Sequence, residues 1–103
     1  MSKDSTTFIA IDPGQTGAIA AIRSSQSVVY DMPVLEDSKL DVEQFYAILK
    51  ALRYNSHKSY IAMERQQSFP GQGVSSTFKT GMMYGQLVVL LYFGQEQGDV
   101  VDL

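Results

Sequence analysis

The sequence predicts an α/β fold for a single domain over residues 1–103, and three observations predict it. Short apolar runs separated by turn residues occupy the first 31 positions. An amphipathic helical pattern follows, and the chain then alternates between strand and helix. The predicted order is β-β-β-α-β-α, with a candidate fifth strand that begins at Val100.

The first three predicted strands cover residues 7–12, 17–22 and 27–31. Each is short, and turn residues separate them, namely residues 13–15 (Pro-Gly-Gln) and the serine pair 24–25. Three short strands with tight connections are typical of an antiparallel meander.

Helix and strand alternate in the rest of the chain. The capping pair Asp41 and Gln44 precedes apolar residues at helical spacing, which predicts a helix over residues 42–54. Residues 58–64 are predicted as a fourth strand. A polar, glycine-rich loop follows, and Ser75 or Ser76 is expected to cap a long helix that ends near residue 93.

Composition narrows the class of protein. The chain is 45% hydrophobic and 18% charged, which is typical of a globular protein. It has no cysteine, which excludes disulfide frameworks, cysteine-ligated zinc and thiol nucleophiles. The longest apolar run, residues 87–93, is too short to span a membrane, and the polar N-terminus has no signal-peptide core. We therefore expect a soluble, cytoplasmic protein with no membrane partner.

Two predicted strands end in a carboxylate, Asp12 on the first and Glu64 on the fourth. If these strands are parallel neighbours, the acids lie side by side at the edge where open α/β sheets bind ligands. Converging carboxylates repel each other unless a cation lies between them, and Mg²⁺ suits such oxygen ligands. Two such ions clamp the attacking and leaving oxygens in phosphodiester cleavage. The local alternatives are an ordinary Asp-Pro-Gly turn at Asp12 and a solvated Glu64 beside Arg65.

Longer motifs surround both acids. Residues 11–20 (Ile-Asp-Pro-Gly-Gln-Thr-Gly-Ala-Ile-Ala) resemble the first motif of RuvC-type Holliday junction resolvases. Residues 62–76 (Ala-Met-Glu-Arg-Gln-Gln-Ser-Phe-Pro-Gly-Gln-Gly-Val-Ser-Ser) closely resemble the second motif of the phage-type branch, and residues 31–33 and 78–85 are similar to that branch as well. The resemblance extends from about residue 8 to the C-terminus. The second motif is much more specific than the first, which is similar to a turn of sugar-kinase and actin-like ATPases.

This resemblance implies an RNase H-like fold with a mixed five-stranded sheet of order 3-2-1-4-5. It implies a homodimeric endonuclease of DNA recombination and repair that nicks two strands of a four-way DNA junction. Its catalytic residues and metal ligands would be Asp12 and Glu64, with Mg²⁺, or alternatively Mn²⁺, and no small-molecule cofactor. The family carries two further carboxylates on a helix after the fifth strand, and this sequence ends before such a helix. We therefore expect a nuclease domain that is incomplete at its C-terminus and inactive or very weak alone.

The loop and helix start after Glu64 hold the candidate DNA contacts. The resemblance suggests that Phe69 wedges into the junction centre, and the alternative is a loop anchor under Pro70. Backbone N–H groups and hydroxyls at the helix start suit a phosphate, and the alternative is a flexible loop with a serine cap. Arg65 and Lys79 are the nearest cations, and the alternative for both is simple solvation. The full candidate set is Arg65, Phe69, Gly71, Gln72, Gly73, Ser75, Ser76 and Lys79.

The long helix is apolar around its circumference, so both of its sides need cover. The sheet covers one side, and we expect a second copy to cover the other, because two symmetric cuts need a twofold protein. Loss of a C-terminal helix is the rival explanation. The expected interface residues are Met82, Met83, Leu87 and Leu90.

Two other functions compete with the nuclease. A catalytically inactive DNA-binding or assembly protein would keep the fold without the last carboxylates. An actin-like or sugar-kinase ATPase fragment would use residues 12–17 as a phosphate loop, but it needs a longer chain and leaves residues 64–76 unexplained. The net charge of −3 argues against a general nucleic-acid binder, whose surface is basic.

Overall fold

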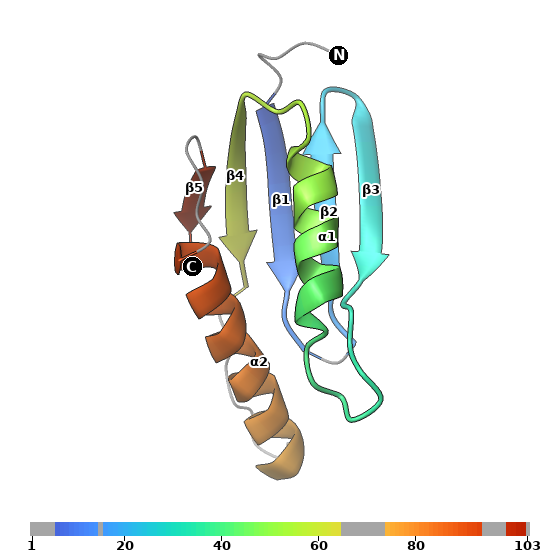
Figure 1. Ribbon diagram of the computed structural model, residues 1–103, viewed down its shortest axis with the longest axis vertical. Coiled ribbons are helices and arrows are strands. Elements are labelled where there is room, and N and C mark those ends of the chain that lie inside the picture. The colour runs from blue at the N-terminus through green and yellow to red at the C-terminus, as the bar shows by residue number, and fades with distance from the viewer. Residues whose placement is uncertain (1–5, 15, 65–73, 94–98, 103) are drawn as a thin grey trace.

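The computed structural model describes residues 6–14, 16–64, 74–93 and 99–102. The predicted α/β class is confirmed (Figure 1). The elements follow one another in the order β1 (Thr6–Asp12), β2 (Ala18–Arg23), β3 (Gln26–Asp31), α1 (Val42–Arg53), β4 (Lys58–Met63), α2 (Val74–Phe93) and β5 (Asp99–Asp102).

The sheet is mixed, with its strands in the order β3-β2-β1-β4-β5. β1, β2 and β3 form the predicted antiparallel meander, because the connections between them are short. β4 joins β1 in parallel after the α1 crossover, and β5 pairs in parallel with β4. The order 3-2-1-4 of the mixed sheet is therefore as the resemblance implied.

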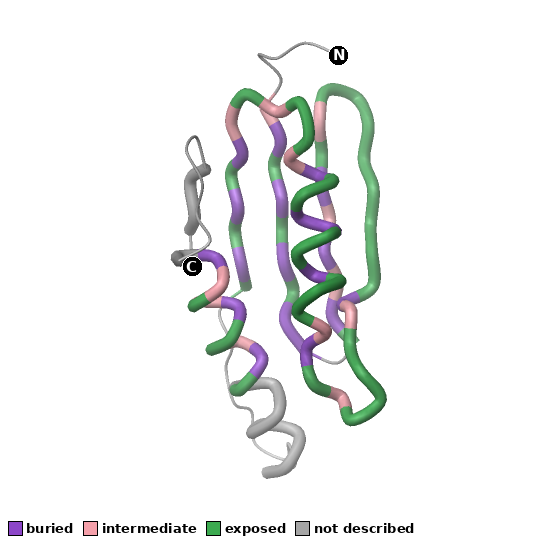
Figure 2. The backbone as a smooth tube through the Cα atoms, viewed as in Figure 1, coloured by how far each residue is buried: buried purple, intermediate pink, exposed green. Residues whose placement is uncertain are grey.

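The core lies on one face of the sheet, where α1 and α2 pack (Figures 1 and 2). Alternation along β1 buries Thr7, Ile9 and Ile11, and the residues paired with them on β4 are buried as well. α1 contributes one apolar stripe at helical spacing, which consists of Phe45, Ile48, Leu49 and Leu52.

Local chemistry explains the bounds of α1. The Asp41 side chain accepts a hydrogen bond from the Gln44 N–H at 3.2 Å, which satisfies one of the free amides at the helix start. Asn55 adopts a φ of 59° just after the helix, a conformation that asparagine tolerates at helix ends. The predicted capping pair is therefore confirmed, and the helix ends one residue earlier than expected.

The opposite face of the sheet is uncovered over its described residues. Phe8 is 56% exposed and Tyr60 is 37% exposed, and their rings stack at a centroid distance of 5.3 Å. Ile22 and Val29 extend this apolar surface across β2 and β3. Asp12 lies four residues after Phe8, and Glu64 lies four residues after Tyr60. Because side chains alternate between the two faces along a strand, both acids belong to this open face.

Candidate metal-binding carboxylate pair

Two parallel strands bring Asp12 and Glu64 together. Ile11 faces Met63 in the register of β1 and β4, so the next residue on each strand is an acid. The Glu64 N–H donates to the Ile11 carbonyl at 2.9 Å, which extends the pairing by one step beyond β4. Both strands end at the same edge of the sheet, at the arrowheads of β1 and β4 in Figure 1. The predicted placement of the acids at one sheet edge is therefore observed.

The two carboxyl groups interact directly. The pKa of Glu64 is raised because its carboxyl group is hydrogen-bonded to that of Asp12 and because the negative charge of Asp12 opposes its ionisation. Both residues are exposed to solvent. A cation bound between two such carboxylates would relieve the repulsion between them.

The turn after Asp12 has a conformation that depends on glycine. Gly14 has a backbone φ of 123°, which residues other than glycine rarely adopt. A Cβ atom at Gly17 would overlap with the carbonyl oxygen of Asp12. The Gly17 N–H donates to the Gly14 carbonyl at 3.1 Å, which closes the turn. Asp12 is thus both the end of a strand and the start of a tight turn, so the two interpretations of this residue are compatible.

Helix α2 supports this turn from the core side. The buried Gly14 N–H donates to the Met83 sulfur at 3.3 Å. Met83 is 2% exposed and lies on the buried stripe of α2 with Leu87 and Leu91. Sequence reasoning did not find this contact, although the spacing of four residues between the stripe members would have placed Met83 in the core.

The described residues bring two candidate metal ligands, Asp12 and Glu64, to one edge of the sheet. No group of three or more His, Cys, Asp or Glu side chains comes together within the described part of the chain. Two carboxylates on neighbouring strands fit Mg²⁺, because this ion is commonly held by one or two carboxylates and several waters. The raised pKa of Glu64 fits the same interpretation, since it reports unbalanced negative charge at the site.

Most of the candidate DNA contacts lie outside the described residues. These are Arg65, Phe69, Gly71, Gln72 and Gly73. The backbone of α2 begins at Val74, so Ser75, Ser76 and Lys79 belong to its first two turns. The serines therefore lie inside the helix rather than before it, and the predicted helix start is two or three residues late.

The four expected interface residues of α2 lie on different sides of the helix. Met83 and Leu87 are buried against the sheet. Met82 is 47% exposed, and Leu90 is half-buried against the core. Only Met82 and Leu90 are therefore within reach of a second copy. Val89, which is 54% exposed, adds to that surface.

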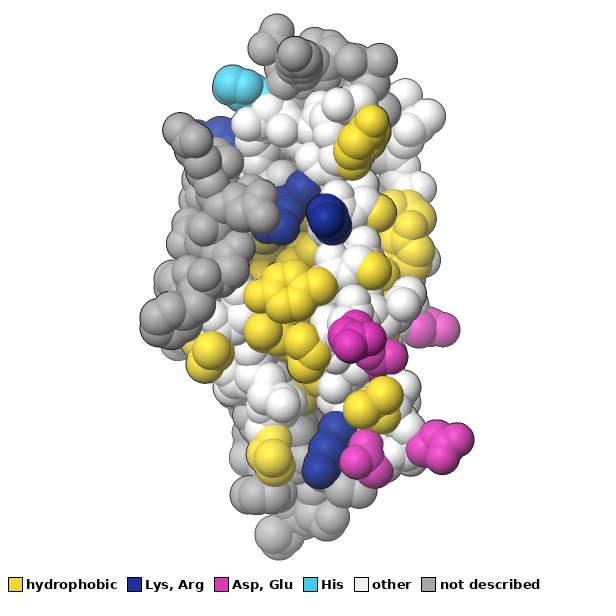
Figure 3. Space-filling view, viewed as in Figure 1, with side chains coloured by type: hydrophobic (Ala, Val, Ile, Leu, Met, Phe, Trp, Pro, Cys, Tyr) yellow, Lys and Arg dark blue, Asp and Glu magenta, His cyan; other side chains and the backbone are white. Residues whose placement is uncertain are grey.

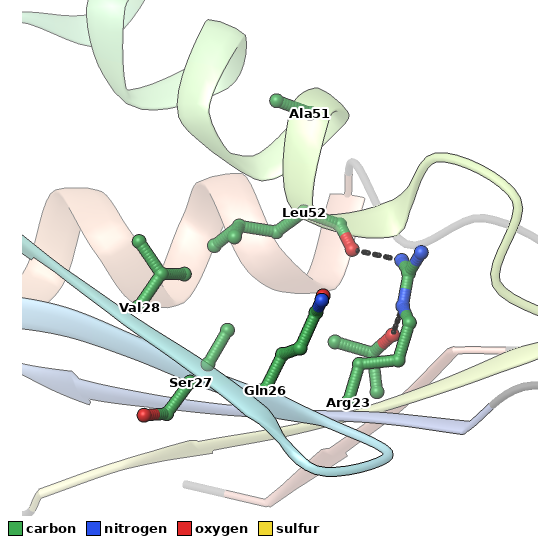
Figure 4. A pocket seen from close by; sticks show the side chains of 8 residues that line it. Arg23, Gln26, Ser27, Val28, Ala51 and Leu52 are labelled. Carbon is green, nitrogen blue, oxygen red and sulfur yellow. Dashed lines mark hydrogen bonds between the residues drawn. The ribbon is translucent and has the colours of Figure 1, made fainter.

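A hollow of about 490 Å³ lies near the opposite end of the sheet (Figure 4). Arg23 crosses it and donates from Nε to the Thr7 hydroxyl at 2.8 Å and from Nη2 to the Leu52 carbonyl at 2.6 Å. The guanidinium thereby satisfies a free carbonyl of the last turn of α1. We therefore assign Arg23 a structural role, in which it connects α1 to the sheet, rather than a role in ligand binding.

Charge is unevenly distributed over the helix-covered face (Figure 3). Acidic side chains gather on one side of its lower half, and Lys and Arg side chains lie at separate places on it. This face therefore lacks a continuous basic patch among its described residues, and duplex DNA has no electrostatic reason to bind there.

The chain was also compared with known proteins. No family model matches it, and no curated protein matches it either. None of the helices among the described residues is long and apolar enough to cross a membrane. The carboxylate pair and the motifs around it are therefore the features of the chain that indicate a function.

Proposed function

We propose that this chain is a metal-dependent endonuclease domain of the Holliday junction resolvase type, with an RNase H-like fold of five strands in the order 3-2-1-4-5. The observation that supports it best is the direct interaction of Asp12 and Glu64 at the ends of two parallel strands. Repelling carboxylates at a ligand-binding sheet edge are costly unless they serve a cation.

In this proposal Asp12 and Glu64 hold Mg²⁺, or Mn²⁺ as an alternative. When bound there, such ions would supply an activated water molecule and charge stabilisation for the leaving oxygen in phosphodiester hydrolysis. Water adds to phosphorus, and one P–O ester bond breaks. The chain's own contribution is to fix two negative oxygens side by side and to leave them open to solvent.

The proposed substrate is a four-way DNA junction, and the proposed assembly is a homodimer. Met82 and Val89 are exposed on α2, and Val89 lines an apolar hollow of about 370 Å³ together with Val42 and Leu90. A twofold contact through this surface would cover apolar area and supply two equivalent sites for paired nicks.

A catalytically inactive DNA-binding or assembly protein is the second candidate. It is favoured by the ligand count, because the described residues bring together only two carboxylates at the site. A metal held by two carboxylates and water binds weakly. We therefore expect very weak cleavage by this chain, while metal binding at the pair remains measurable.

The test measures metal binding before cleavage. We expect Mn²⁺ to broaden the NMR signals of residues near Asp12 and Glu64 in the unmodified chain. This effect should be lost in Asp12→Asn and Glu64→Gln, and it should persist in Glu36→Gln, which removes an equal charge from an exposed residue outside the site. Equal Mn²⁺ binding by all four proteins would exclude a metal site at the pair. Cleavage of a four-way junction with Mg²⁺ that depends on Asp12 would then separate the nuclease from the inactive alternative.

A further inference from the structure

We propose that Met83 is a positioning residue for Asp12, acting through a hydrogen bond from the Gly14 N–H to its sulfur. This inference rests on the proposed metal site for its functional meaning, although the contact itself does not depend on that function. Three features of the structure support it, namely the burial of the contact, the glycine-dependent turn and the place of Met83 on α2.

The contact satisfies a buried amide. The Gly14 N–H lies 3.3 Å from the Met83 sulfur, and both residues are buried. A buried N–H without a partner is costly, whereas a thioether sulfur is a weak but adequate acceptor. Replacement of the sulfur by a methylene would therefore leave the Gly14 amide without its acceptor.

One backbone contact already fixes the far end of the turn, because the N–H of the buried Met32 donates to the Gly17 carbonyl at 3.0 Å. Gly14 and Gly17 have the largest backbone freedom of any residue type, and the turn needs both of them. The Gly17 N–H bond to Gly14 closes the turn on itself but does not fix it to the core. Met83 fixes the other end of the turn, because it extends from α2 to Gly14, two residues after Asp12.

The position of Met83 distinguishes it from the other members of its stripe. Leu87 and Leu91 lie one and two turns further along α2 and are equally buried. Their role is apolar packing, which methionine and leucine perform almost equally well because their volumes are similar. Only the stripe member that reaches the Asp12 turn has a hydrogen-bonding atom.

Two substitutions separate hydrogen bonding from packing. Met83→Leu keeps the apolar volume and removes the acceptor, whereas Met83→Gln keeps an acceptor of similar reach and buries an amide. If Met83 only packs, Met83→Leu should exceed Met83→Gln in stability, in protection of the Gly14 amide and in Mn²⁺ affinity. If the hydrogen bond positions Asp12, the glutamine variant is less stable but keeps the site better. Leu91→Met is the matched control, because it makes the reverse exchange on the same stripe.

Two readouts follow the site itself. The first is hydrogen exchange at the Gly14 amide by NMR, which needs no metal. We expect Met83→Leu to accelerate it about three- to tenfold, the equivalent of one net hydrogen bond, and Met83→Gln to accelerate it less. The second is Mn²⁺ affinity at the carboxylate pair, which we expect to fall by a similar factor in Met83→Leu. Leu91→Met should change neither quantity.

Unchanged Gly14 exchange in Met83→Leu would overturn the proposal, and so would faster exchange with unchanged Mn²⁺ affinity. If Met83→Gln does not fold, the comparison of Met83→Leu with Leu91→Met decides the question. If the unmodified chain binds no Mn²⁺ but loses Gly14 protection in Met83→Leu, the metal site is wrong and the link between Met83 and the turn stands.

Discussion

Glu64 is the residue whose ionisation the fold changes most clearly among the described groups. Its pKa is raised by the hydrogen bond to Asp12 and by the charge of Asp12. A group whose pKa is higher in the folded state binds its proton more tightly there, so its contribution to stability is complete at low pH. That contribution is lost as the pH rises through the raised value.

This linkage predicts a pH-dependent difference between the unmodified chain and Glu64→Gln. The two proteins should have similar melting temperatures below pH 4, and the unmodified chain should become the less stable one as the pH rises to 7. Mg²⁺ should narrow the difference at pH 7. Thermal unfolding across this pH range is the measurement, with Glu36→Gln as the control. Parallel stability curves for the unmodified chain and Glu64→Gln would contradict the prediction.

Two glycines provide a second prediction at the residue scale. We expect Gly17→Ala to destabilise the fold by about 1–3 kcal/mol, because its new Cβ would overlap with a backbone carbonyl that has little room to move. Gly85→Ala should leave the stability unchanged or raise it by up to about 1 kcal/mol. Gly85 lies in the middle of α2, and a Cβ atom there would meet no neighbouring atom. Urea unfolding compares the two. Equal effects would show that the turn can rearrange.

The carboxylate pair was predictable from the sequence, whereas the hydrogen bond that connects the neighbouring turn to α2 was not. Asp12 and Glu64 each follow an apolar strand, and parallel neighbours end at the same sheet edge, so a local pattern contained the information. The bond between Gly14 and Met83 joins residues 69 positions apart, and no local pattern encodes it. Contacts of this kind appear only once the packing of α2 is known.

At the scale of elements, α2 has one side against the sheet and one side exposed. Sequence reasoning found that the helix is apolar all round but could not assign its residues to sides. The orientation of a helix about its own axis is set by tertiary packing when apolar residues surround it. That is why Met83 and Leu87 belong to the core while Met82 is exposed.

The exposed side of α2 leads to a prediction about assembly. If α2 forms the dimer, Met82→Glu and Val89→Glu should each give a folded monomer, because each places a charge in an apolar contact. Tyr54→Glu is the control, since Tyr54 is 72% exposed at the end of α1. Sedimentation of the unmodified chain and the three variants is the measurement. A dimer that persists in both α2 variants would place the interface elsewhere.

At the scale of the whole molecule, the sheet has a covered face and an open one. Phe8, Ile22, Val29 and Tyr60 all contribute to the apolar surface of the open face. Exposed apolar surfaces of this kind are uncommon in monomeric proteins and mark sites of association. The class of fold and the order of β1 to β4 followed from periodicity and family resemblance. The open face did not, because period-two alternation in the strands is too weak here to predict which face is covered.

The pairing of β1 with β4 also has a consequence for how the protein folds. Ile11 faces Met63, a separation of 52 residues along the chain, whereas β1, β2 and β3 are joined by short turns. Local hairpins close within microseconds, and distant parallel pairings must first overcome a larger loop-closure entropy. The pairing of Asp12 with Ala18 of β2 is therefore expected to form early, within the meander. Glu64 joins Asp12 only when β4 docks, so the acidic pair is assembled late and its mutual repulsion opposes one of the last steps of folding.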